Sequence, residues 1–424
     1  MLLRYFLLIE LLTSSPLQAT EQEDQPEQRL PAPPYSQPID SKIKPQQPSP
    51  APTPQQADSD KKKRDTRQPP LQLLGQEVQP GSSQTLSWFS SQLPGSFVIP
   101  IPVLVVHGSQ PGPSVCITSA IHGDELNGIE INRRVIHSLS PDKVRGTVIS
   151  VPVVNLSGLW RGDRYLSDRR DLNRFFPGQE DGSATAQVAY QLFHNIISHC
   201  DTLVDLHTGS LARENWPQLR ADLTQDAIAE MVTGFGPISV LQSLAPAGSL
   251  RGAATAAGIP TVVMEVGGPM RLNTQLVGQG VDSLNAYLSS AGVIKRQNFF
   301  KTPQPIFYQS SWIRARSGGI LINQVELGGQ VKRGQILGEI HDPINNSTSF
   351  VEAPFAGVML GRAQNQFVSP GYALFHIGKR RSLEELERQG EADKQSVIEQ
   401  SNSQMGLTTE ASAASSSATK PDTH

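Results

Sequence analysis

The sequence predicts an α/β fold, in which a mostly parallel or mixed sheet is covered by helices, followed by a small C-terminal all-β domain. Three observations support this. Short runs rich in β-branched residues alternate with helical runs between residues 76 and 300, as in strand–helix–strand units. After Thr302, glycine, valine and short strand-like runs replace that alternation. Both flanks of the chain contain too few apolar residues to build a core.

Residues 1–19 are predicted to be a signal peptide. Leu2 to Leu12 is almost wholly apolar, Arg4 lies near its start, and Ala19 offers a small residue for cleavage. A helix of this run would reach about 16 Å, too short for a hydrocarbon core of about 30 Å. We therefore expect export to the periplasm. Because Glu10 interrupts the run, a frayed helix of a cytoplasmic protein is the alternative.

Two segments outside the folded region are predicted to be disordered. Residues 20–75 form a Pro/Gln-rich linker that cannot bury enough apolar surface to offset chain entropy. Residues 379–424 form a mostly disordered tail, rich in Ser, Ala and Thr at its end. With 36 Lys+Arg against 39 Asp+Glu, no charge excess points to a nucleic-acid partner. Beyond the leader, the sequence shows no stable membrane span.

The predicted catalytic domain, residues 76–300, alternates strands with helices. The expected strands are Phe97 to Val106, Ser114 to Ser119, Thr147 to Val153, Thr202 to Leu206 and Thr261 to Val266. The expected helices are Asn127 to Ser138, Thr185 to Ser198, Asp222 to Thr233 and Leu250 to Ala257. In such sheets, sites gather where strands end and loops begin. Cys116 and Cys200 each lie in or near an apolar run, so we expect buried free thiols rather than a disulfide.

The predicted β domain, residues 301–378, contains an internal repeat. The pattern V-x-x-G-x-x-L-x-x-I runs from Val331 to Ile340 and again from Val368 to Ile377. This resembles the two halves of a biotinyl/lipoyl-like β sandwich, in which a Lys between the halves carries the cofactor. Residues 341–353 contain no Lys. We therefore expect a structural or site-capping domain, not a carrier.

Two motifs offer metal ligands. His122 and Glu125 stand in H-G-D-E after an apolar strand, and residues three apart share a helix face and can reach one metal. An exposed helix start is the alternative. His207 ends the strand of D-L-H-T-G, where alternation places Asp205 on the same face, able to orient the imidazole. A lone histidine satisfied at a strand end is the alternative there.

Two further motifs offer polar groups for a substrate. Asn173 and Arg174, with Arg164 upstream, could present an amide and a planar guanidinium to a carboxylate. A loop salt bridge between neighbouring Arg and Asp residues is the alternative. Glu265 lies near the end of a very apolar strand, where a partly desolvated carboxylate suits general-base work. Its alternative is a structural pair with an arginine such as Arg251.

In this order, H-G-D-E, R-Y followed by D-L-N-R-F-F-P-G, D-L-H-T-G and E-V-G-G closely resemble the succinylglutamate desuccinylase/aspartoacylase family, which is related to the zinc carboxypeptidases. The resemblance runs from about Phe97 to Gly378 and implies a zinc-carboxypeptidase-like fold. It implies one zinc ion, with the ligands His122, Glu125 and His207. It also implies that Glu265 is the general base that activates the attacking water.

The same resemblance implies substrate-binding residues. Arg164, Asn173 and Arg174 match residues that bind the substrate carboxylate and polarise the scissile carbonyl, with Arg164 stabilising the oxyanion. Arg251 matches a further substrate-binding arginine with looser spacing. Some members also use a tyrosine from the C-terminal domain, for which Tyr372 is the candidate.

The sequence therefore predicts an exported zinc-dependent amidohydrolase that cleaves an amide bond next to a free carboxylate. The substrate would be an N-acyl amino acid or a small peptide. An envelope peptidase or amidase that trims cell-wall peptides is one alternative, and a catalytically silent binding protein of the same fold is another. No oligomeric state is predicted.

We expect the mature chain to begin near Thr20, because cleavage after Ala19 would remove the apolar leader. N-terminal sequencing of protein recovered from periplasmic and cytosolic fractions measures this. Recovery of Met1-initiated protein in the cytosolic fraction alone would contradict the prediction.

Overall fold

The structure is a computed structural model and describes residues 68–90, 99–295, 306–307 and 309–379. The predicted signal peptide, most of the predicted linker and nearly all of the predicted tail lie outside these residues. The linker ends earlier than predicted. Strands β1 (Leu71–Leu73) and β2 (Gln76–Val78) pair as a hairpin, in which Leu73 and Val78 are buried in the core. The apolar residues near position 71 thus belong to the fold.

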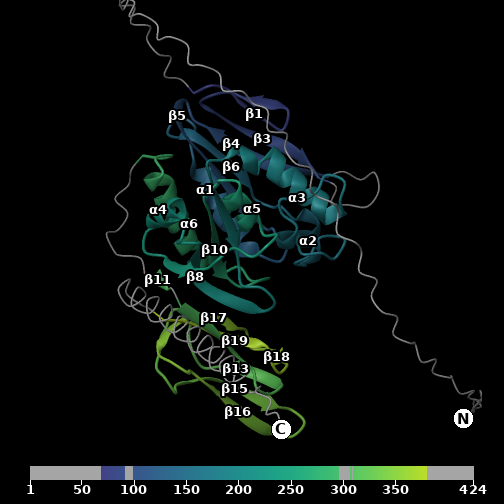
Figure 1. The fold of residues 1–424 in the computed structure, drawn as a ribbon, viewed down its shortest axis with the longest axis vertical. Coiled ribbons are helices and arrows are strands. Elements are labelled where there is room, and N and C mark those ends of the chain that lie inside the picture. The colour runs from purple at the N-terminus through teal and green to yellow at the C-terminus, as the bar shows by residue number, and fades with distance from the viewer. Residues whose placement is uncertain (1–67, 91–98, 296–305, 308, 380–424) are drawn as a thin grey trace, which may run out of the picture. The chain divides into compact units, whose positions relative to one another are not determined.

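Most described strands form one mixed sheet (Figure 1), so the predicted fold class is confirmed. Its order is β12-β19-β17-β8-β10-β7-β5-β6-β4-β3, with β9, β11 and β14 paired off this path. The central strands β10, β7, β5 and β6 run parallel, and antiparallel strands flank them. The strands are β3 (Ser82–Phe89), β4 (Pro100–His107), β5 (Gln110–Ser119), β6 (Arg145–Val151), β7 (Thr202–His207), β8 (Arg213–Ala221), β9 (Ser239–Gln242), β10 (Thr261–Gly267), β11 (Ile306–Phe307), β12 (Gln309–Arg314), β14 (Gln330–Val331), β17 (Gly357–Ala363) and β19 (Ala373–Lys379).

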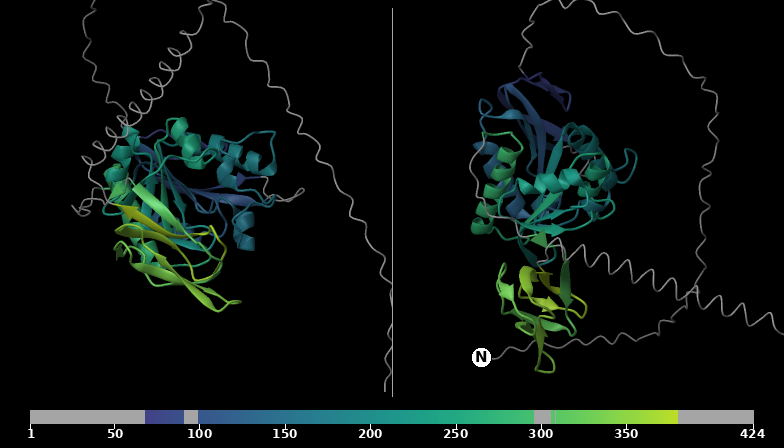
Figure 2. Two further views of the ribbon diagram at one scale, coloured as in Figure 1. Left: turned by 60° about the horizontal axis from the view of Figure 1, so that its bottom comes forward. Right: turned by 60° about the vertical axis from the view of Figure 1, so that its left-hand side comes forward.

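Helices cover both faces of the central strands (Figures 1 and 2). Alternate residues of a strand enter opposite cores: Val115 and Ile117 of β5 join the core under α1, α4 and α6, whereas Cys116 joins the core under α3 and α5. The helical segments are α1 (Leu126–Ser138), α2 (Leu156–Arg161), η1 (Leu172–Arg174), α3 (Ala184–Asn195), η2 (Ile197–His199), α4 (Asp226–Thr233), α5 (Leu250–Ala256) and α6 (Thr274–Ser290). No helix within the described ranges is long and apolar enough to cross a bilayer.

The C-terminal strands contain the predicted repeat. The apolar positions of both copies are buried in a single core, and the two repeat glycines share a left-handed backbone, with φ of 76° at Gly334 and 84° at Gly371. A smaller sheet has the order β16-β15-β13-β18, formed by β13 (Gly319–Asn323), β15 (Ile336–Asp342), β16 (Ser347–Glu352) and β18 (Phe367–Val368). Strands β17 and β19 instead continue the main sheet, because β17 pairs with β8.

The prediction of free thiols is wrong, because Cys116 and Cys200 form a disulfide with a Cα–Cα distance of 5.7 Å. The two residues are 84 positions apart in sequence. Parallel pairing of β5 with β7 sets Cys116 opposite Leu203, which brings Cys200 alongside. The disulfide therefore follows from strand register, which the sequence pattern around each cysteine does not contain.

We predict that replacing both cysteines with serine lowers the free energy of unfolding by roughly 2–4 kcal/mol, since the cross-link restricts the unfolded chain. Chemical denaturation of the double variant and the wild type measures this. Iodoacetamide treatment of the unreduced, denatured wild type should leave both cysteines unmodified. Alkylation of both would contradict the disulfide.

Candidate metal centre and active site

The predicted site residues come together where parallel strands end. His122 and Glu125 follow β5, His207 is the last residue of β7, and Glu265 lies directly opposite His207 on β10. Neighbouring parallel strands present their carboxyl ends at one edge of the sheet, which accounts for this convergence. The glycine of H-G-D-E is also required, since a Cβ at Gly123 would lie 2.1 Å from the carbonyl carbon of Gly158.

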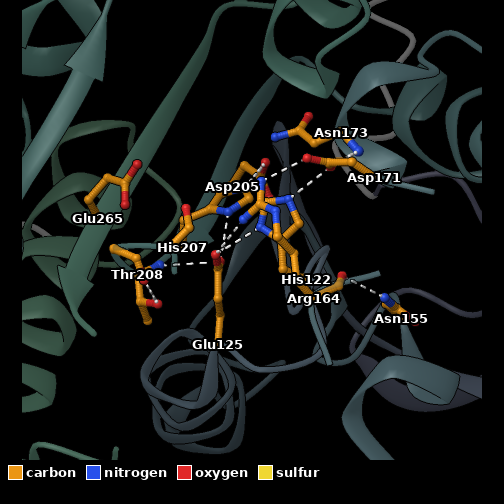
Figure 3. A network of polar contacts seen from close by, with 12 residues as sticks. His122, Glu125, Asn155, Arg164, Asp171, Asn173, Asp205, His207, Thr208 and Glu265 are labelled. Atoms are coloured by element: carbon orange, nitrogen blue, oxygen red, sulfur yellow. Dashed lines mark hydrogen bonds and ion pairs between the residues drawn. The ribbon is translucent and has the colours of Figure 1, made fainter. Parts of the chain in front are cut away.

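The Glu125 carboxylate lies between two imidazoles (Figure 3). Its Oε1 is 2.8 Å from Nδ1 of His122, and its Oε2 is 2.8 Å from Nδ1 of His207. Each imidazole meets a second carboxylate through its other nitrogen: Nε2 of His122 is 3.1 Å from Asp171, and Nε2 of His207 is 2.7 Å from Asp205. Both ring nitrogens of each histidine are thus occupied, and the rings have fixed orientations.

The two outer carboxylates are themselves held in place. The Thr118 hydroxyl donates to Asp205 at 2.7 Å, and the Arg164 guanidinium donates to Asp171 at 2.8 Å. The predicted pairing of Asp205 with His207 is present. Asp171 is one of the Asp residues of the loop for which a salt bridge with a neighbouring arginine was the alternative. In the structure it contacts His122 and Arg164.

Charge controls the protonation of this buried cluster. Burial opposes ionisation of Glu125, but the imidazoles of His122 and His207 outweigh it and hold the pKa of Glu125 well below its usual range. Burial alone would lower the pKa of His207. The carboxylates of Asp205 and Glu125 instead raise it well above its ordinary value. The cluster therefore favours bound positive charge.

The donor chemistry fits a divalent transition-metal ion. One ligand atom from each of His122, Glu125 and His207 can be chosen so that all three lie within 4.8 Å of one another, and all three residues are buried. Two imidazole nitrogens and one carboxylate oxygen are a common ligand set for such ions and leave a coordination position open. Carboxylates that hold the far nitrogen of each imidazole are a usual supporting arrangement.

Arg164 provides a donor beside this cluster. Its Nη1 lies 3.6 Å from Oε1 of Glu125, while Nη2 is bonded to Asp171. Nη1 is buried and has no hydrogen-bond partner among the described residues. A buried, unpaired N–H carries a substantial free-energy cost, so this donor is available for an incoming oxygen.

A cavity of about 240 Å³ opens over the cluster. Asn173 and Arg174 line it together with Arg164. The Asn173 carbonyl oxygen accepts the backbone N–H of Leu250 at 2.8 Å, which fixes the amide, and the Arg174 side chain is exposed. A larger cavity, of about 930 Å³, is lined by none of the predicted site residues. The smaller cavity, which the predicted site residues line, is therefore the candidate active site.

Glu265 lines the same cavity but is set apart from the metal-ligand cluster (Figure 3). Its Oε1 lies 3.1 Å from Nε of Arg220, and its Oε2 accepts a hydrogen bond from Asn215 at 3.0 Å. The alternative role predicted for Glu265 was a structural ion pair with an arginine such as Arg251. The structure pairs Glu265 with Arg220, which the sequence analysis did not identify because it did not predict β8.

Arg251 also lines the cavity, without a carboxylate partner in the described parts of the chain. Its guanidinium donates to the backbone oxygens of Ser243 and Leu244 and to the Ser243 hydroxyl. Burial and the charge of Arg220 lower the pKa of Arg251 to about 10, so it remains a cation at neutral pH. The predicted substrate-binding role is compatible with this position.

The C-terminal strands contribute an aromatic wall. Trp312 of β12 lines the cavity, and the Arg213 guanidinium lies 5.5 Å from its ring centroid and 5.6 Å from that of Tyr372. The Tyr372 hydroxyl donates to the backbone oxygen of Leu211 and does not line the cavity. Trp312, which lies outside every motif, is thus the aromatic residue that this region presents to the cavity.

Comparison with known proteins supports the motif resemblance. Residues 111–291 match the sequence model of the succinylglutamate desuccinylase/aspartoacylase catalytic domain. The N-alpha-acetyl-L-2,4-diaminobutyric acid deacetylase of Halomonas elongata is 27% identical over 276 residues, which cover 62% of this chain and 80% of that protein. The resemblance to this family is therefore confirmed.

Solved structures share the fold. A succinylglutamate desuccinylase/aspartoacylase from Rhodobacter sphaeroides is 24% identical, with a TM-score of 0.63 over 70% of this chain and 96% of that one. The product-bound Ectoine utilization protein EutE (DoeB) from Ruegeria pomeroyi is also 24% identical, with a TM-score of 0.63 over 70% of this chain and 94% of that one. The likeness covers most of each relative.

We predict that His122→Ala and His207→Ala each abolish tight metal binding while the fold persists, because each removes one of only three ligands. Elemental analysis of the purified variants, with circular dichroism to verify folding, measures this. His137→Ala, at an exposed position of α1, is the control and should keep its metal. Full metal occupancy in both site variants would rule out this ligand set.

Proposed function

We propose that this protein is a zinc-dependent hydrolase that cleaves an amide bond next to a free carboxylate, a proposal supported by the match of residues 111–291 to the succinylglutamate desuccinylase/aspartoacylase catalytic domain. The observation that carries the proposal is one cavity that contains both the buried His122–Glu125–His207 cluster and the separate carboxylate of Glu265. A single zinc ion bound by that cluster would polarise a carbonyl oxygen and activate a water molecule.

The chain's own residues supply the remaining chemistry. Glu265 accepts a proton from the attacking water and returns it to the departing amine. The free Nη1 of Arg164 donates to the carbonyl oxygen as negative charge develops there. Asn173 and Arg174 hold the substrate carboxylate, and Arg251 adds a second fixed cation to the cavity.

The cavity size bears on the substrate. At about 240 Å³ it is small among ligand sites, which supports an N-acyl amino acid over a cell-wall peptide. The proposal that the protein acts outside the cytoplasm gains support from the Cys116–Cys200 disulfide, since disulfides persist mainly in oxidising compartments. The substrate would then be one that is available in the cell envelope.

Glu265→Gln tests catalysis separately from binding. The amide keeps the shape of the side chain but cannot accept the proton, so kcat should fall by roughly 10²–10⁴-fold. Zinc content and KM should change little, because ground-state contacts remain. Glu352→Gln, an exposed position on β16, is the matched control. A folded, zinc-loaded Glu265→Gln enzyme with wild-type kcat would refute the assignment, and a wild type inactive on all acylated amino acids would favour the silent binding protein.

Arg174→Ala should instead raise KM, by roughly tenfold to a hundredfold, because it removes a charge-assisted contact to the substrate carboxylate. The effect on kcat should be smaller if that contact is equally strong in the ground and transition states. Arg174→Lys keeps the charge but loses the planar fork, so its KM should lie between the two. Steady-state kinetics on acylated amino acids measure all three enzymes, and an unchanged KM in Arg174→Ala would exclude the contact.

A further inference from the structure

We propose that Asn215 of β8 and Gly361 of β17 are positioning residues for Glu265, so that the C-terminal strands take part in aligning the catalytic carboxylate. This inference rests on the proposed general-base role of Glu265. It concerns residues that lie outside the four motifs and, in the case of Gly361, outside the matched residues 111–291.

Each oxygen of the Glu265 carboxylate has one partner, and both partners come from β8. Arg220 lies 3.1 Å from Oε1, and Asn215 donates to Oε2 at 3.0 Å. The Asn215 contact is a directional hydrogen bond, whereas Nε of Arg220 forms an ion pair without a hydrogen bond. The Arg220 side chain is 30% exposed, so solvent weakens its contact, whereas Asn215 is 2% exposed. The buried amide is therefore the stricter constraint.

An irregularity in strand pairing places Asn215 on the face of Glu265. Glu265 of β10 is the register partner of Gln218 on antiparallel β8, and Gly267 is the partner of Asn215. Between these two pairs, β10 advances by two residues whereas β8 spans three. The extra residue in β8 is a β-bulge, which reverses the side-chain alternation beyond it. Without the bulge, Asn215 would point to the opposite face of the sheet and could not reach Glu265.

Gly361 provides the space that the Asn215 side chain occupies. The two residues are register partners between β17 and β8. A Cβ at position 361 would lie 2.6 Å from Oδ1 of Asn215, while the next nearest atom, the Glu214 carbonyl oxygen, would be at 3.3 Å. The backbone of Gly361 is not left-handed. A methyl group there would therefore act mainly by displacing the Asn215 amide.

The neighbours on the far side of Gly361 form a tightly packed row. His376 of β19 is the next register partner of Gly361, and Trp312 of β12 is the next partner of His376. The two rings stack at 4.7 Å with 4° between their planes. Burial and the nearby charge of Arg220 lower the pKa of His376 to about 3, so it is neutral. These packed, uncharged rings lie on the side of Gly361 away from Asn215, so they limit how far a side chain at position 361 could move away from Asn215.

The test is a double-mutant cycle of Asn215→Ala and Gly361→Ala in the zinc-loaded, full-length enzyme. Each single variant should lose kcat by roughly 10–100-fold, because a catalytic group misplaced by about 1 Å costs that much, with zinc content and KM near wild type. In the Asn215→Ala background, Gly361→Ala should cause little further loss, since the clashing amide is gone. Gly318→Ala, where a Cβ would meet no atom closer than 3.4 Å, is the control and should keep wild-type kcat.

Asn215→Leu keeps about the size of the side chain but removes the donor without adding a charge beside Glu265, so it tests the same proposal if Gly361→Ala fails to fold. It should lose kcat at constant KM. Losses that multiply in the double variant, or an Asn215 variant that raises KM with wild-type kcat, would overturn the inference. If Glu265→Gln loses kcat while both single variants retain it, this inference fails and the proposed function stands. A Glu265→Gln enzyme with wild-type kcat overturns both.

Discussion

A single buried carboxylate, that of Glu125, organises the site. It lies 2.8 Å from an imidazole on each side, and those imidazoles come from the ends of two neighbouring parallel strands. This arrangement requires β5 and β7 to be adjacent and in register, so that their carboxyl ends meet at one edge of the sheet. The disulfide between Cys116 and Cys200 links the same two segments from the opposite end. The geometry of the cluster thus depends on the alignment of these two strands.

Strand β8 connects β10, the strand that carries Glu265, to the C-terminal strands. It pairs with β10, which carries Glu265, on one side and with β17 of the C-terminal strands on the other. Its residues line the cavity with Arg213, Asn215 and Arg220. The C-terminal strands are therefore joined to the sheet that carries the site by main-chain pairing with β8, and not only by surface packing. The absence of lysine between the repeat halves is consistent with a structural role for that region.

The accuracy of the sequence predictions depends on how local each signal is. The spacing of His122 and Glu125 and the apolar strand before His207 are contained in short segments, and the structure brings these residues together. Strand β8 escaped prediction because charged residues and Pro217 interrupt its alternation, so Asn215 and Arg220 were missed with it. The disulfide and the partner of Glu265 depend on strand register and on a bulge, neither of which a single sequence specifies. Helix α6 contains Gly278 and Gly280, which mask its helical pattern.

The charged groups around the two histidines balance one another only in part. Three carboxylates, those of Glu125, Asp171 and Asp205, surround the two histidines, and Arg164 contributes one positive charge. Buried charges are tolerated only when they are compensated. The demand for further positive charge raises the pKa of His207, and a metal ion that requires neutral imidazoles would meet the same demand. A divalent cation together with Arg164 would balance the three carboxylates. Asp171 and Asp205 therefore do more than orient the histidines. Their negative charges also determine how much positive charge is needed to balance the site.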